Sequence, residues 1–106
     1  MPRREYTDDE IILCTYIALY GRGLLIEKKI ASIEKRPEGS VKMKVQNIAA
    51  MLDEEGIERS QDIKPLSGVP AGQDGRRTNW DVVGKWARTS QDEHKQKCKD
   101  IIRSSQ

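Results

Sequence analysis

Four side chains between residues 42 and 47 have the types and the spacing needed to contact the base edges of DNA. Read at 100° per residue, they share one face of a helix and supply a cation, a thioether and two amides, which are groups that contact bases in the major groove. They are Lys42, Met43, Gln46 and Asn47. The opposite face carries an apolar stripe at i, i+4, i+7 and i+11, formed by Val41, Val45, Ile48 and Leu52. The pattern predicts a DNA-reading helix over residues 37–54, although a polar face that only meets solvent has a similar composition.

A DNA-reading helix also needs cations around it, because phosphate contacts supply much of the affinity of a DNA-binding protein. Residues 22–47 carry seven basic and three acidic side chains, whereas residues 48–63 carry one basic and five acidic side chains. We expect the basic segment to meet the phosphates and the acidic segment to face away from them. The candidate phosphate contacts are Arg22, Lys28, Lys29, Lys35, Arg36, Ser40, Lys44, Arg76 and Arg77.

Three residues in this helix bear on that prediction. Lys44 borders the apolar stripe, and we expect its long side chain to carry the ammonium outward to a phosphate. Glu38 would repel a phosphate at the start of the helix. Gly39 weakens the first turn because glycine loses more conformational freedom than other residues when it becomes helical.

Two further helices are predicted ahead of the reading helix. Thr7 and Glu10 have the spacing of a capping box, which predicts a helix from there to about Tyr20. A second helix is predicted over residues 25–35, and Pro37 suits the first position of the reading helix that follows. Three helices with a very short second connection are typical of a helix-turn-helix unit, here residues 1–55.

The second half of the chain is expected to complete one all-α domain. Residues 56–77 are rich in Gly, Pro, Ser and Asp, which predicts a long loop. Residues 78–106 are expected to form a C-terminal helical segment that packs its tryptophans, Trp80 and Trp86, on the three-helix core. Thr78 is the predicted N-cap of this segment, and Ser90 should restart the helix after a break.

Catalytic, metal-binding and cofactor-binding patterns are not found in the sequence. The single histidine, His94, lies among charged residues and is expected to be a solvated surface residue. It lacks the His or Cys companions of a zinc site, and no glycine-rich nucleotide-binding motif is present. We therefore expect no enzyme activity, metal, cofactor or small-molecule substrate.

The cysteines and the hydropathy pattern bear on the cell compartment. Cys14 and Cys98 do not form a C-x-x-C pair and are typical of reduced thiols. The longest apolar run, about ten residues, is too short to cross a membrane. We expect a cytoplasmic protein that does not associate with membranes.

Three short motifs occur in one order along the chain. Residues 6–10 have a T-x-x-E pattern at the start of a helix, and residues 36–48 have an R-x-x-x-S-V-x-x-K-x-x-N-like block. Residues 66–68 and Trp80 are similar to a Gly-rich loop that leads to a Trp-containing helix. In these motifs the chain resembles the helical region that precedes the catalytic domain in a group of bacterial HNH-type endonucleases.

The resemblance implies a DNA-associated helical module in restriction or mobile-element settings. It singles out Ser40, Val41, Lys44 and Asn47 as the matching positions, of which Lys44 and Asn47 would contact DNA. The catalytic histidines of the HNH motif do not follow in this chain, so the resemblance does not extend to nuclease activity.

A different class of function is also compatible with the sequence. Exposed Met43, Ala50 and Met51 would form an adaptable apolar surface for a protein partner, and the chain would then be a regulatory or interaction module that does not bind nucleic acid. A homodimer through the first or the last helix is compatible with both functions.

Overall fold

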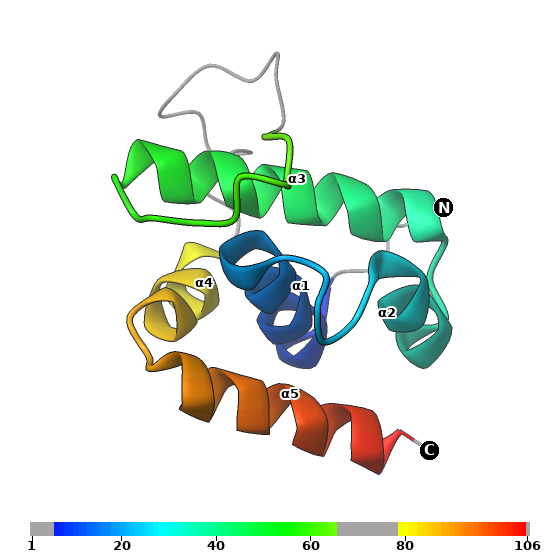
Figure 1. Ribbon diagram of the computed structural model, residues 1–106. Coiled ribbons are helices and arrows are strands. Elements are labelled where there is room, and N and C mark those ends of the chain that lie inside the picture. The colour runs from blue at the N-terminus through cyan, green and yellow to red at the C-terminus, as the bar shows by residue number, and fades with distance from the viewer. Residues whose placement is uncertain (1–5, 66–78, 106) are drawn as a thin grey trace.

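The described part of the chain is entirely helical. A computed structural model describes residues 6–65 and 79–105, and these residues form five α-helices and no strand. Helix α3 lies on one side of the molecule and α5 on the other, with α4, α1 and α2 side by side between them (Figure 1). The helices are α1 (Asp8–Tyr20), α2 (Glu27–Glu34), α3 (Glu38–Glu54), α4 (Trp80–Ala87) and α5 (Gln91–Ser104). The predicted all-α fold with a Trp-containing C-terminal helix is confirmed.

Helix α1 is the centre of the fold because it is buried on all sides. Every residue of the run 10–19 is buried, and α2, α3, α4 and α5 all pack against this helix. The predicted capping box is present, with the Glu10 amide 3.1 Å from the Thr7 hydroxyl and the Thr7 amide 3.0 Å from the Glu10 carboxylate. The helix ends at Tyr20, as predicted, and Gly21 adopts a φ of +86° that favours glycine.

The connection between α2 and α3 is three residues long and turns sharply. Lys35 caps α2 in the left-handed conformation, with a φ of +53°, and the Arg36 amide donates to the Ala31 carbonyl at 3.0 Å. Helix α2 is shorter than the predicted range, residues 25–35. Ile26, inside the predicted range, precedes the helix as its N-cap and is 46% exposed, whereas Ile30 is fully buried.

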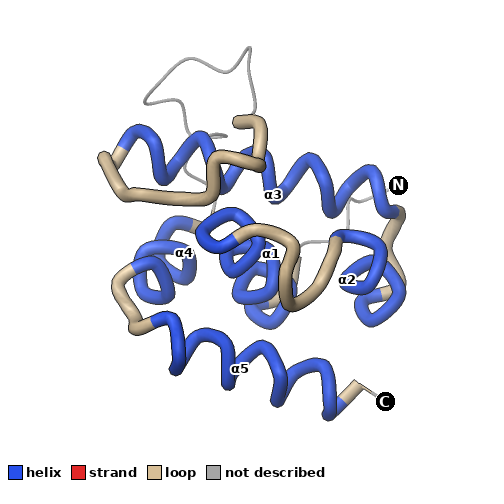
Figure 2. The backbone as a smooth tube through the Cα atoms, in the orientation of Figure 1, coloured by secondary structure: helices blue, strands red, loops and turns tan. Residues whose placement is uncertain are grey.

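Helix α3 buries its predicted apolar stripe, and all four residues of the stripe are inaccessible to solvent. Residues 56–65 turn back along the C-terminal half of this helix (Figure 2). Arg59 holds this segment by an ion pair to Asp53 and by hydrogen bonds of 2.7 Å to the carbonyls of Ser60 and Ile63.

Ala50 and Met51 are buried, so the expectation that they form an exposed apolar surface is wrong.

Helices α4 and α5 both pack on α1. Ser90 caps α5 by accepting from the Glu93 amide at 3.3 Å, which confirms the predicted restart. Asn79, with a φ of +66°, is the N-cap of α4; the predicted cap, Thr78, lies outside the described residues.

The expectation that His94 is a surface residue is wrong. Its side chain is fully buried between α1, α4 and α5, with Nε2 2.9 Å from the Ile12 carbonyl. The rings of Tyr16 and Trp86 lie 5.1 and 5.2 Å from the imidazole centroid. The sequence did contain a sign of this burial, because His94, Cys98 and Ile101 follow helical spacing and all three are buried.

Candidate nucleic-acid interface

The N-terminal half of α3 presents three of the four predicted base-reading side chains at the surface. Lys42 and Met43 are exposed, Met43 at 59%, and Gln46 is partly exposed. Lys42 forms an exposed ion pair with Glu38 at 3.3 Å, one helical turn away. Such a pair is weak in water, so the ammonium remains available to a stronger anion.

Asn47, the fourth predicted base reader, is not at the surface. It is 7% exposed, and its Oδ1 accepts a hydrogen bond of 3.3 Å from the Lys44 ammonium. Lys44 is 4% exposed and also donates to Oδ1 of Asn79, at 3.0 Å. In this structure Asn47 therefore cannot reach a base edge, and Lys44 does not extend outward to a phosphate.

The burial of Lys44 has an electrostatic consequence. Removal from water disfavours the charged ammonium and lowers the pKa of Lys44 to about 8. The Tyr6 ring, whose centroid lies 5.2 Å from Nζ, contributes a cation–π contact. Through its bond to Asn79, Lys44 joins α3 to the N-cap of α4.

Arg36, a predicted phosphate contact, is bound inside the protein. Its guanidinium forms a two-pronged ion pair with the Glu10 carboxylate, including an Nη2–Oε1 bond of 2.9 Å, and stacks 4.1 Å from the Tyr6 ring centroid. The Tyr6 hydroxyl donates to the Ser40 carbonyl at 3.1 Å. Arg36 and Tyr6 therefore fix the start of α3 against α1, and the assignment of Arg36 to a phosphate does not fit this structure.

The other predicted phosphate contacts differ in how available they are. The Arg22 guanidinium donates hydrogen bonds to the Glu27 carboxylate, from Nε to Oε1 at 2.9 Å and from Nη2 to Oε2 at 2.8 Å. This pairing lowers the pKa of the Glu27 carboxyl. Ser40 is partly buried. Arg76 and Arg77 lie outside the described residues. The lysines of α2 and its C-cap are exposed and form no salt bridge in the part of the chain that the structure describes; they are Lys28, Lys29 and Lys35.

A surface hollow of about 470 Å³ adjoins this exposed part of α3. Its lining residues are Tyr6, Arg36, Pro37, Gly39, Ser40 and Met43. Pro37 is the N-cap of α3 and offers no side-chain hydrogen bond, so the first turn carries no such cap. The negative charge at this end of α3 comes from Glu38, whose carboxylate lies in the first turn and offsets the positive end of the helix dipole.

Among residues 6–65 and 79–105, no cluster of His, Cys, Asp or Glu has the arrangement of a metal site, and no helix is long and apolar enough to cross a membrane. No protein-family model, curated protein or solved structure was found to match this chain.

Proposed function

We propose that this protein binds double-stranded DNA through the N-terminal half of α3. The observation that carries the proposal is the surface group of Lys42, Met43 and the partly exposed Gln46 on α3, together with the exposed lysines of α2, which form no salt bridge among the described residues. A cation and an amide can pair with purine edges, and a thioether can contact a thymine methyl group. The resemblance to the helical region of HNH-type endonucleases points in the same direction, and the association with nuclease systems stays a prediction.

The contacts divide into two groups by position. Lys42, Met43 and Gln46 would face the bases, and the phosphates would be bound by Lys28, Lys29 and Lys35 from α2 and its C-cap. Because residues 56–65 lie along the other half of α3, only about two helical turns can enter a groove. Helix-turn-helix proteins also read bases with the N-terminal residues of the recognition helix.

A salt titration of DNA binding tests the proposal. Fluorescence anisotropy with a random-sequence duplex should show affinity that falls along a straight log–log line between about 50 and 200 mM salt, because bound phosphates release counterions. The double substitution Lys28→Ala/Lys29→Ala should weaken binding to all sequences and flatten the slope by about two.

Lys97→Ala/Lys99→Ala is the matched control, because it removes two positive charges from α5 on the far side of α1. It should leave the slope within about one unit of the wild-type value. The proposal is contradicted if the protein does not bind DNA at the lowest salt concentration. It is also contradicted if the α5 substitution weakens DNA binding as much as the α2 substitution does. The interaction-module alternative would then need a surface other than the predicted one, because Ala50 and Met51 are buried.

A further inference from the structure

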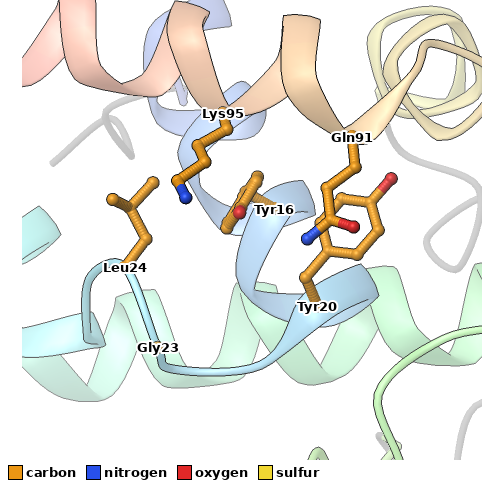
Figure 3. Close-up of a pocket in the computed structure, with 6 residues that line it drawn as sticks. All are labelled: Tyr16, Tyr20, Gly23, Leu24, Gln91 and Lys95. Atoms are coloured by element: carbon orange, nitrogen blue, oxygen red, sulfur yellow. The ribbon is translucent and has the colours of Figure 1, made fainter.

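Two neighbouring hollows are lined by residues of α5 and of the α1–α2 loop. Helix α5 lies on the opposite side of α1 from α3 (Figure 1). The first hollow has a volume of about 230 Å³ and is lined by Tyr16, Tyr20, Gly23, Leu24, Gln91 and Lys95 (Figure 3). The second, of about 320 Å³, is lined by Leu24, Lys99, Ile102 and Arg103. Leu24 lines both hollows, so the two hollows adjoin each other along α5, and we call the pair the α5 groove.

The α5 groove is positively charged along its length. Lys95, Lys99 and Arg103 follow one another at intervals of four residues, so they share one side of the helix with a rise of about 6 Å between them. All three are exposed, and none forms a salt bridge within residues 6–65 and 79–105. The acidic residues of α5, Asp92, Glu93 and Asp100, line neither hollow.

The same groove has apolar surface and hydrogen-bonding groups between its cations. Leu24 and Ile102 are partly buried apolar side chains. Figure 3 shows the Lys95 ammonium reaching down between Leu24 and Tyr16, with the Gln91 amide in front of the Tyr20 ring. The occupant must therefore offer both negative charge and apolar side chains.

We propose that the α5 groove docks an acidic peptide segment of a partner protein, with carboxylates on the three cations and an apolar side chain against Leu24 and Ile102. The α5 stretch from Gln91 to Arg103 is about 18 Å long, which an extended segment of about six residues spans. Charge complementarity along the rim would steer and orient the segment, and the apolar contact would anchor it.

The burial of Tyr16 favours a peptide over a nucleic-acid strand. Single-stranded nucleic acid is bound by stacking bases on open aromatic rings. Tyr16 is 4% exposed and packs against Tyr20 and His94, so its ring does not form an open stacking platform. The docking proposal does not depend on DNA binding by α3, because the two surfaces lie on opposite sides of α1.

Selection from a randomised peptide library displayed on phage tests the proposal with the whole chain. Peptides enriched on the wild-type protein should contain Asp or Glu together with Leu, Ile or Phe. Their synthetic versions should bind at least about tenfold more weakly to Lys95→Glu/Lys99→Glu, because two favourable charge contacts become repulsive. Leu24→Ala should weaken the same peptides by about three- to tenfold.

The control is Lys97→Glu, a charge reversal on α5 at a residue that lines neither hollow of the groove. It should retain binding within about twofold, and circular dichroism of every variant confirms that the helices are intact. The proposal is overturned if the enriched peptides lack acidic residues or if no peptide is enriched. It is also overturned if Lys97→Glu weakens peptide binding as much as Lys95→Glu/Lys99→Glu does. Tighter binding of a single-stranded oligonucleotide that is lost with Lys95→Glu/Lys99→Glu would overturn it in favour of nucleic acid.

Discussion

Arg36 and Glu10 form an ion pair that is almost completely removed from solvent, with side chains 7% and 1% exposed. The pair joins the α2–α3 connection to the first turn of α1. The same Glu10 carboxylate closes the capping box with Thr7, so one side chain serves both the start of α1 and the placement of α3.

Breaking this pair should destabilise the fold strongly. Arg36→Ala leaves the buried Glu10 carboxylate without its guanidinium, and we expect the free energy of unfolding to fall by about 3–5 kcal/mol. Urea denaturation followed by circular dichroism measures the change. Lys42→Ala breaks the exposed pair with Glu38 and is the control, with an expected change below about 0.5 kcal/mol. Similar effects of the two substitutions would show that Glu10 and Arg36 are not held in a buried pair.

Replacing the neighbouring amides Gln46 and Asn47 by alanine should affect different properties: Gln46→Ala the DNA specificity and Asn47→Ala the stability. Asn47→Ala removes a buried acceptor of the Lys44 ammonium and should cost about 1–3 kcal/mol of stability. Gln46→Ala should change stability by less than about 0.5 kcal/mol. On a selected duplex it should reduce discrimination at one base pair by about 1–3 kcal/mol. Unfolding curves together with binding to the selected duplex and to its single-base variants separate the two effects; loss of specificity with Asn47→Ala in a fully stable protein would contradict the structure.

Acidification should destabilise the protein through His94. Burial lowers the pKa of this imidazole below its ordinary value of about 6.5, so the unfolded chain binds the proton more readily than the folded one. Neutral His94 makes its full contribution to the free energy of unfolding above about pH 6.5. This contribution is lost as the pH falls from there toward the lower pKa of the folded state.

The difference in unfolding free energy between wild type and His94→Leu isolates this effect, because the carboxylates titrate in both proteins. Relative to the variant, wild type should be less stable at about pH 5 than at about pH 7.5. A difference that does not change with pH would mean that the imidazole is solvated in the folded state.

Replacement of Gly39 by alanine should stabilise α3. A Cβ at this position meets no atom within 4 Å, and alanine loses less conformational freedom in a helix, so we expect a gain of up to about 1 kcal/mol. Gly56→Ala also places its Cβ in open space, but a φ of +69° strains any L side chain, and this variant should be less stable than wild type. Thermal unfolding of both variants tests the contrast; a loss with Gly39→Ala would indicate that the first turn of α3 is not helical.

The sequence alone determined the features that depend on neighbouring residues. The capping box of Thr7 and Glu10 and the Ser90 cap each join groups three residues apart, and the apolar stripe of α3 follows from helical periodicity. These local relationships predicted the starts of α1 and α5 and the buried face of α3.

Only the tertiary structure decided which polar side chains remain at the surface. Lys44 is bound by Asn79, 35 residues away, Arg36 by Glu10, 26 residues away, and His94 by Ile12, 82 residues away. Helical periodicity fixes the direction of a side chain around its own helix, but not which other helix packs over that direction. Because α1 lies at the centre and α4 begins beside α3, the side chains of Lys44, Arg36 and His94 are buried, as is that of Asn47, although the sequence placed all four at the surface. The candidate DNA contacts are therefore confined to the N-terminal half of α3 and the lysines of α2 and its C-cap.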